Sequence, residues 1–286
     1  MSDYNFLAGL PDDRLYTPAI KRHSLYKIQI HNYYVNLFST AMRKTWPQRA
    51  YLGLYSGAGR ARVEETDEIV ETTALSAVRV QYPFTKYIFV DNDPNCIDAL
   101  KRRAGPLLGR RDLTLLLEDA NSAGEKIIEA MPRYSPTHKL LSFCFIDPFS
   151  ARLDFDLIRT LGTRYQMDFL IVLMLGRDVR TNFRQYLSDP SDTRIASLID
   201  DPRWREEWTA KGHGSHRLIR FILEKFDEAM TRIGYRAARP DDAHPIRVVG
   251  RNVFLYSLVF YSKSPLGQKF WHVTRRGADP QIPLDI

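Results

Sequence analysis

The sequence predicts an α/β fold built on a mostly parallel, doubly wound sheet. Short apolar runs alternate with segments of helical periodicity from residue 49 to about residue 180. Runs that are apolar throughout are typical of parallel strands buried on both faces. Four successive runs each end in a small or acidic cluster. Because ligands bind at the carboxyl ends of such strands, we expect the four clusters to converge.

The first element is a helix within residues 18–46, where apolar residues recur at helical spacing and Pro47 ends the pattern. The predicted strands are Ala50–Tyr55, Lys86–Val90, Leu113–Leu117, Leu140–Ile146 and Phe169–Met174, and the predicted helices between them are Asn95–Arg103, Ser122–Met131 and Phe155–Leu161. The longest apolar run, Asp168–Gly176, is far shorter than the roughly 20 residues of a membrane-spanning helix, so it indicates a buried strand.

The stretch Thr181–Arg239 is richer in charge and contains a helical run at Ser215–Arg232. It therefore predicts a small helical insertion. The β-rich run Asn252–Tyr261 predicts a final strand, and Pro265–Trp271 a loop or short helix. The expected organisation is an N-terminal helical segment (1–48), a core (49–180), the insertion (181–245), and final strands with a tail (246–286).

The composition favours a polyanionic partner. Forty-one Lys and Arg face thirty-four Asp and Glu, which gives a net charge of +7 and a pI near 9.3. The N-terminus has no secretory signal pattern, and the two cysteines, Cys96 and Cys144, have no metal-like spacing, so we expect a cytoplasmic protein. Cys144 lies within an apolar strand and is expected in the core. His213 and His216 are three residues apart in a loop, and we predict no metal site there.

The first candidate site motif is Ser56-Gly-Ala-Gly59, directly after the first core strand. Glycines there allow a tight turn and let a ligand approach the backbone, although a plain turn has the same pattern. Asp91 ends the second core strand, where nucleotide-binding folds place a carboxylate on ribose hydroxyls. Its alternative role is to cap the next helix, for which Asp93 is the better candidate.

The next two clusters add acceptors and an aromatic ring. In Glu118-Asp-Ala-Asn121, Asp119 is positioned to accept from an adenine amino group, while Asn121 or Ser122 is expected to cap the following helix. In Asp147-Pro-Phe-Ser150, a carboxylate and carbonyls can orient an exocyclic amine and stabilise the charge that develops on its nitrogen. Phe149 offers a face on which a planar base can stack.

Five segments together resemble the three-Cys-motif partner family, which is similar to Rossmann-like class I S-adenosylmethionine-dependent methyltransferases with a small winged-helix-like insertion. They are Tyr51–Gly59, Phe89–Asp93, Glu118–Asn121, Phe145–Phe149 and Tyr256–Trp271. The resemblance implies cofactor binding by residues of the first three clusters, namely Tyr55, Ser56, Gly57, Gly59, Asp91, Asn92, Asp119 and Ala120. The Asp-Pro-Phe turn also resembles that of tRNA guanine dimethyltransferases, which implies that Asp147, Pro148 and Phe149 meet the target amine.

These features favour a methyltransferase that uses S-adenosylmethionine and acts on an amine of an RNA or DNA base. The family usually has an acidic residue where this chain has Gly53. That difference favours an alternative, a non-catalytic protein of the same fold that binds nucleic acid or a three-Cys-motif partner protein. A third hypothesis is a methyltransferase that acts on a small molecule. It would need an enclosed apolar pocket formed by the aromatic residues within 26–38.

Overall fold

The computed structural model describes residues 9–109, 111–135, 137–212, 214–238, 242–248 and 253–277. The chain divides into two compact units, Met1–Phe145 with Gln268–Ile286, and Ile146–Gly267. The first unit holds the first three residue clusters of the sequence analysis, and the second begins one residue before Asp147.

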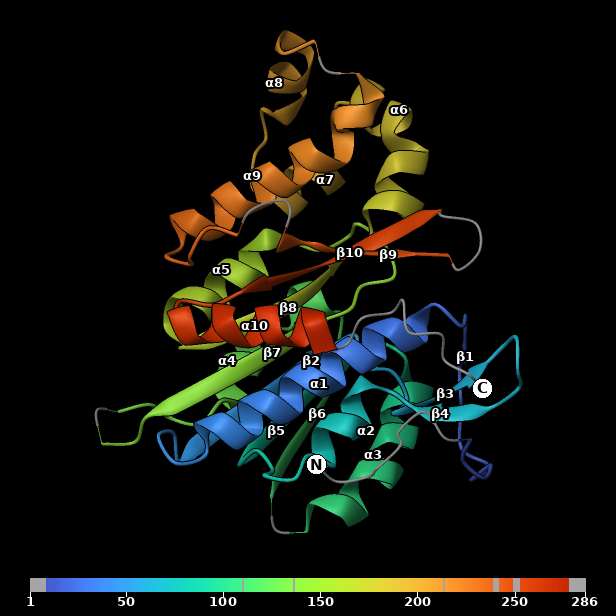
Figure 1. The fold of residues 1–286 in the computed structure, drawn as a ribbon, viewed down its shortest axis with the longest axis vertical. Helices are drawn as coiled ribbons and strands as arrows, with labels where there is room; N and C mark the ends of the chain where they lie inside the picture. The colour runs from blue at the N-terminus through green and yellow to red at the C-terminus, as the bar shows by residue number, and fades with distance from the viewer. Residues whose placement is uncertain are drawn as a thin grey trace. The chain divides into compact units, whose positions relative to one another are not determined.

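A seven-stranded sheet is the centre of the fold, and its spatial order is β6-β5-β2-β7-β8-β10-β9 (Figure 1). The strands are β2 (Gln48–Leu54), β5 (Lys86–Asp91), β6 (Asp112–Leu117), β7 (Leu140–Ile146), β8 (Met167–Leu173), β9 (His244–Arg247) and β10 (Phe254–Tyr261). Strand β5 is parallel to β2 and β6, while β10 is antiparallel to β8 and β9. The strand order reverses between β2 and β7, so the carboxyl ends of these strands form the topological switch point where ligands bind in such sheets.

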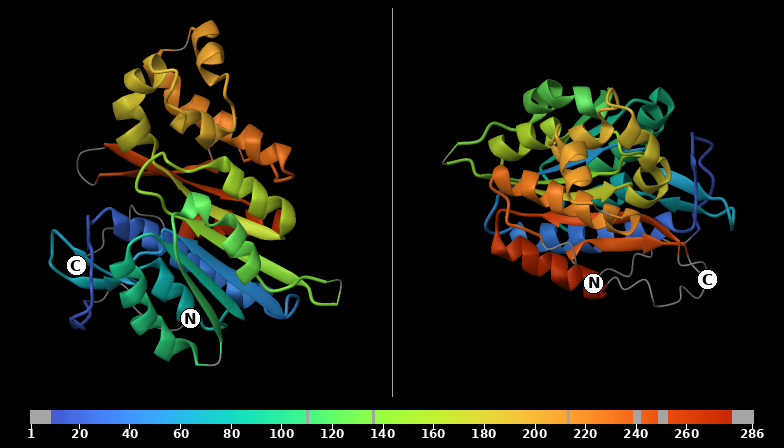
Figure 2. Two further views of the ribbon diagram at one scale, coloured as in Figure 1. Left: turned by 180° about the vertical axis from the view of Figure 1, so that it is seen from behind. Right: turned by 90° about the horizontal axis from the view of Figure 1, so that it is seen from above.

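In the first unit, helices cover both faces of the sheet. Helix α1 (Ser24–Met42) lies on one face, and the reverse view shows α3 (Pro94–Leu108) and α4 (Gly124–Ala130) on the other (Figure 2). Tyr34 and Phe38 of α1 are fully buried and their rings lie 5.1 and 5.8 Å from that of Phe143 in β7. Two of the aromatic residues of α1 thus pack in the core instead of lining a pocket, which weakens the small-molecule hypothesis.

All five predicted core strands are confirmed to within two residues, and Cys144 is fully buried as expected. The first helix begins at Ser24 rather than residue 18, because Ala19–Ile20 forms a strand, β1, that pairs with β3 (Arg60–Val63). Together with β4 (Ile69–Glu71), these strands make a three-stranded sheet that the sequence analysis missed. This sheet and the short helix α2 (Thr73–Val78) follow the glycine loop directly.

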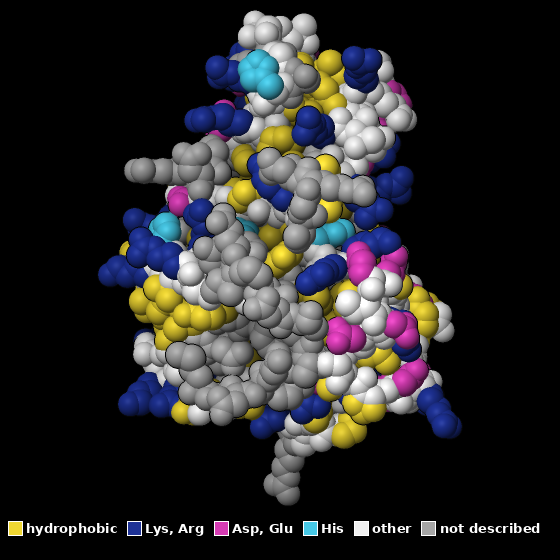
Figure 3. Space-filling view, turned by 45° about the vertical axis from the view of Figure 1, so that its right-hand side comes forward, with side chains coloured by type: hydrophobic (Ala, Val, Ile, Leu, Met, Phe, Trp, Pro, Cys, Tyr) yellow, Lys and Arg dark blue, Asp and Glu magenta, His cyan; other side chains and the backbone are white. Residues whose placement is uncertain are grey.

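The second unit contains α5 (Phe155–Arg164), a π-helical turn η2 (Leu175–Val179), and the helices of the insertion. These are α6 (Arg180–Ser188), α7 (Arg194–Ile199), α8 (Trp204–Ala210), the short turn η3 (Ser215–Arg217) and α9 (Leu218–Arg232). Trp208 of α8 packs against two other helices of the insertion. The centroid of its ring lies 5.0 Å from that of Phe183 in α6 and 5.2 Å from that of Phe221 in α9. Lys and Arg side chains are spread over these helices at the top of Figure 3.

The predicted helical insertion is therefore present, but its winged-helix character is not confirmed, because the described residues from 181 to 238 form helices and turns only. The C-terminal segment forms a longer helix than expected, α10 (Pro265–Gly277). Asn252, the expected start of the final strand, lies outside the described residues. Across the described part of the chain, no helix combines the length and hydropathy needed to cross a membrane.

Candidate functional site

The glycine loop after β2 depends on left-handed backbone at three positions. Tyr55, Gly57 and Gly59 have φ angles of 59°, 64° and 80°. A Cβ at Gly59 would lie 2.8 Å from Cγ of Leu75 and 2.9 Å from Cδ1 of Leu100, whereas nothing lies within 4 Å of a Cβ at Gly57. Gly59 is thus required by packing inside the protein. Gly57 instead leaves one side of the loop open, as close approach of a ligand to the backbone requires.

Asp91 joins this loop to the end of β5. Its Oδ2 accepts a hydrogen bond of 2.7 Å from the backbone N–H of Gly57, and its Oδ1 accepts one of 3.0 Å from the N–H of Asp93. The carboxylate is buried, and each oxygen keeps a second lone pair for another donor. Asp93 is the cap of α3, as expected, because its side chain accepts from the N–H of Asn95.

The end of β6 reaches the same loop through Tyr55. The hydroxyl of Tyr55 forms a side-chain hydrogen bond with Asn121, and burial together with the nearby Asp119 raises the pKa of Tyr55 to about 12. Asp119 itself caps the 3-10 turn η1 (Ala120–Ser122) by accepting from the N–H of Asn121. The following helix, α4, has Ala123 at its N-cap and no side-chain cap, so the expectation that Asn121 or Ser122 caps it is wrong. Asp119 keeps an exposed side chain beside buried Ala120.

Three of the four predicted clusters are therefore brought together within the first unit. Two further features of this site suit a polar ligand. The Oγ of Ser56 is buried and has no hydrogen-bond partner among the described residues. Asn92, which follows Asp91, is exposed.

An N-terminal strap, residues 10–17, supports the back of the glycine loop, and the sequence analysis missed it. Arg103 of α3 holds it: the guanidinium donates to the carbonyl of Ala58 at 2.7 Å, to the carbonyl of Tyr16 at 2.9 Å, and to both carboxylate oxygens of Asp13. Only 4% of the Arg103 side chain is exposed. Its guanidinium holds the pKa of Asp13 at about 2. The three-residue run Lys101-Arg-Arg103 gave no signal that its last member is buried.

Tyr16 extends from the strap toward the end of β5. Its hydroxyl forms a side-chain hydrogen bond with Asp93, and burial followed by the charges of Asp93, Cys96 and Asp91 raises the pKa of Tyr16. Leu15 beside it packs on a small cluster that includes Ala58 and Cys96. Tyr16 is thus a further residue next to the carboxylates of the site.

The position of Gly53 is closed by aromatic rings. A Cβ there would lie 3.0 Å from Cδ1 of Phe89 and 3.3 Å from Cε1 of Tyr51. Tyr51 in turn is fixed by a 2.9 Å hydrogen bond to the buried His31, whose pKa burial lowers to about 4. A side chain at this position would therefore press on two buried rings, so the packing here suits glycine better than the acidic residue of the resembled family.

The fourth cluster directly follows β7 and belongs to the second unit. Pro148 is buried, Asp147 is partly exposed, and 86% of Phe149 is exposed. Burial and then the charge of Asp147 raise the pKa of Tyr256 in β10. An exposed aromatic ring on a turn stiffened by a buried proline offers a flat apolar surface to a ligand.

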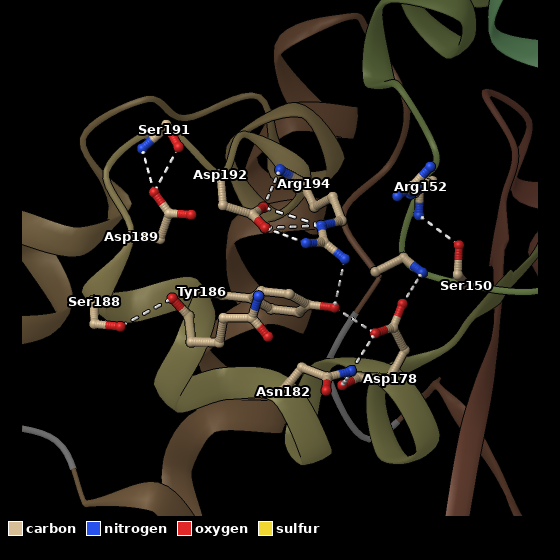
Figure 4. A network of polar contacts seen from close by, with 12 residues as sticks. Ser150, Arg152, Asp178, Asn182, Tyr186, Ser188, Asp189, Ser191, Asp192 and Arg194 are labelled. Atoms are coloured by element: carbon tan, nitrogen blue, oxygen red, sulfur yellow. Dashed lines mark hydrogen bonds and ion pairs between the residues drawn. The ribbon is translucent and has the colours of Figure 1, made fainter.

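A polar network fixes the segment after this turn (Figure 4). Oδ2 of Asp178 accepts a 2.6 Å hydrogen bond from the N–H of Ala151. Its Oδ1 accepts from Nδ2 of Asn182 at 2.9 Å and from the hydroxyl of Tyr186 at 2.5 Å. Arg194 donates to the same hydroxyl. The turn and the start of the insertion are therefore held as one element of the second unit.

No group of three or more His, Cys, Asp and Glu residues suited to a metal ion occurs in the described ranges. His213 lies outside them, and His216 is exposed.

Comparison with known proteins gives structural matches but no sequence family. No family model matches the chain, and no curated protein matches it significantly. A magnesium protoporphyrin IX methyltransferase from Synechocystis PCC 6803 with bound SAH is 11% identical, with a TM-score of 0.42 over 82% of this chain and 84% of that one. An O-methyltransferase from Bacillus cereus is 11% identical, with a TM-score of 0.45 over 84% and 87%. An rRNA methylase from Streptococcus thermophilus is 10% identical, with a TM-score of 0.38 over 82% and 93%.

Identities and scores this low place the chain in none of these families, so the fold class rests on the chain's own strands. Counted along the chain, the seven strands have the spatial order 3-2-1-4-5-7-6, with the seventh antiparallel to its neighbours. This is a Rossmann-like sheet of the kind found in class I methyltransferases.

Proposed function

We propose that the protein binds S-adenosylmethionine at the glycine loop and transfers its methyl group to an amine of a nucleic-acid base. The observation that carries the cofactor part is the pairing of Asp91 with Gly57. It places a buried carboxylate beside an open, glycine-lined backbone at the switch point of the sheet.

The residues present fit this cofactor. The free lone pairs of Asp91 accept from the two ribose hydroxyls, and the exposed carboxylate of Asp119 accepts from the adenine amino group. Asn92 and Ala120 flank the adenosine, and the unpartnered Oγ of Ser56 faces a polar ligand group, with Tyr55, Gly57 and Gly59 giving the loop its shape. Bound there, S-adenosylmethionine supplies an electrophilic methyl group that passes to the amine nitrogen as its bond to sulfur breaks.

The proposed role of Asp147, Pro148 and Phe149 is to hold the target base. Phe149 stacks on the base, which suits a ring that is 86% exposed on a buried proline. The carboxylate of Asp147 accepts from the exocyclic amine, orients its lone pair and stabilises the positive charge that develops on nitrogen. The surplus amine proton then leaves to solvent.

Thermal melting with S-adenosylmethionine and S-adenosylhomocysteine tests the cofactor. A ligand at 100 times its dissociation constant stabilises the folded state by about 2.7 kcal/mol, so the melting temperature should rise clearly. A matched control is Asp98→Asn, which removes an exposed carboxylate of α3 from the surface pair with Arg102 and should bind the cofactor as the parent chain does. Absence of any shift at millimolar ligand would contradict the proposal.

Transfer of a labelled methyl group to total RNA and to DNA tests the reaction. Asp147→Ala should abolish transfer and keep the cofactor-induced thermal shift. Asp156→Ala, which removes an exposed carboxylate at the start of α5, should leave both unchanged. Labelling of small molecules but of neither nucleic acid would contradict the substrate class while leaving the cofactor in place.

A second candidate is a protein of the same fold that binds nucleic acid or a three-Cys-motif partner protein without catalysis. The crowded position at Gly53 favours it, because Phe89 and Tyr51 lie close to where the resembled family has a carboxylate. This candidate predicts nucleic-acid or partner binding with neither a cofactor shift nor methyl transfer.

A further inference from the structure

The π-helical turn η2 and the helix α6 that follows it carry three exposed arginines without counter-charges. Arg177, Arg180 and Arg184 are exposed, and none has a carboxylate partner among the described residues. Three exposed arginines elsewhere do have such partners: Arg102, Arg220 and Arg232 pair with Asp98, Glu224 and Asp200. Positive charge is thus left uncompensated on the η2–α6 segment.

Arg180 and Arg184 are four residues apart in α6 and therefore share one face of that helix. Arg177 lies in the π-helical turn directly before α6 and is exposed like the other two. The other side of the helix carries Asp178 and Tyr186, which hold it against the rest of the unit (Figure 4). The segment is consequently fixed in direction while the arginine side chains remain free.

The same helix is tied to the turn proposed to hold the base. The 2.6 Å hydrogen bond from the N–H of Ala151 to Asp178 joins them, and Arg177 is the neighbour of Asp178 in the chain. Phe149 is two residues before Ala151. Exposed cations without counter-charges and an exposed aromatic ring therefore lie on two segments of the second unit that are joined by a hydrogen bond. Single-stranded nucleic acid is bound by this combination of a backbone-tracking cationic surface with a stacking ring.

We infer that Arg177, Arg180 and Arg184 form a contact surface for the phosphate backbone of a single-stranded nucleic acid whose base stacks on Phe149. The inference rests on the proposed function and adds to it the direction in which the substrate strand leaves the turn. Arginine suits this role because its planar group makes bidentate contacts with phosphate.

The test is the salt dependence of binding to a short fluorescein-labelled single-stranded RNA, with single-stranded DNA of the same sequence as a second probe. Each phosphate contact to a single strand contributes about 0.7 to the slope of log affinity against log salt. The variant R177Q/R180Q/R184Q should therefore lose about 2 from this slope and bind at least tenfold more weakly at low salt.

The control variant R102Q/R220Q/R232Q removes the same formal charge from exposed arginines that already have partners. The slope measured for this control variant should differ from that of the parent chain by less than about 0.7, which is the contribution of one phosphate contact. An equal loss of slope in both variants would overturn the inference, because net charge alone would then explain binding. An unchanged slope in the first variant, or no binding of either probe by the parent chain, would overturn it as well.

Thermal shift with S-adenosylmethionine separates this inference from the proposed function. Both triple variants should keep the shift of the parent chain, since the arginines lie outside the cofactor site. If the shift is present and the slope is unchanged, the arginine surface is wrong and the cofactor site stands. If the shift is absent in the parent chain, the proposed function fails whatever the slope.

Discussion

The two glycines of the loop should respond differently to the same substitution. In Gly59→Ala, the left-handed backbone costs about 1–2 kcal/mol. The new methyl group would also meet Leu75 and Leu100 at 2.8 and 2.9 Å, which costs about another 1–3 kcal/mol through overpacking. The total loss of unfolding free energy should be about 2–5 kcal/mol. In Gly57→Ala only the backbone cost applies, because the space is open.

Cofactor binding should respond in the opposite order, with the larger loss of affinity in Gly57→Ala. A methyl group on Gly57 enters the open side of the loop, where the cofactor is proposed to lie, so Gly57→Ala should bind S-adenosylmethionine far more weakly while remaining folded. Urea unfolding measures the stability of both variants, and isothermal titration calorimetry measures cofactor affinity. Equal destabilisation by the two substitutions would refute the packing argument. Unchanged affinity in Gly57→Ala would refute close approach of the cofactor to the loop.

Substitutions at three further positions follow from the same structure. Asp91→Asn should abolish the cofactor-induced thermal shift, because an amide has one acceptor oxygen where the carboxylate has two; a retained shift would count against ribose binding. Asp13→Asn should be less stable than the parent chain at about pH 5, and the difference in urea unfolding should vanish as pH falls from 3.8 toward about 2. Arg103 stabilises only the ionised form of Asp13, which is why the pKa of Asp13 is lowered. A stability difference that stays constant with pH would therefore exclude the ion pair as the cause of the difference. Phe149→Ala should leave stability within about 0.5 kcal/mol and weaken RNA binding by about 1–3 kcal/mol, and Phe149→Tyr should restore it; equal binding by all three chains would remove the stacking role.

The sheet could be predicted from the sequence because β2, β5, β7 and β8 are mainly apolar runs that are buried along nearly their whole length, and β6, although only partly buried, is also mainly apolar. The sequence also allowed the prediction that the glycine loop lies near Asp91, because the carboxyl ends of the parallel strands β2 and β5 meet at one edge of the sheet. Both predictions use local patterns and one topological rule.

The strap could not be predicted in this way. Arg103 and Asp13 are separated by 90 residues, and nothing near either of them distinguishes a buried ion pair from a solvated one. The β3–β4 hairpin was missed for a different reason. Its partly buried arginines alternate with Ala61 and Val63 over only four residues, too short a run to stand out from the loop that precedes it.

The buried guanidinium of Arg103 sets a limit on how the protein can be shortened or fused. A chain cut back to the start of α1 would lose Asp13 and the strap carbonyls that hold Arg103. The guanidinium would then keep the carbonyl of Ala58 in the glycine loop as a partner without the strap to position it. Affinity tags and fusion partners therefore belong upstream of residue 10 or at the other end of the chain.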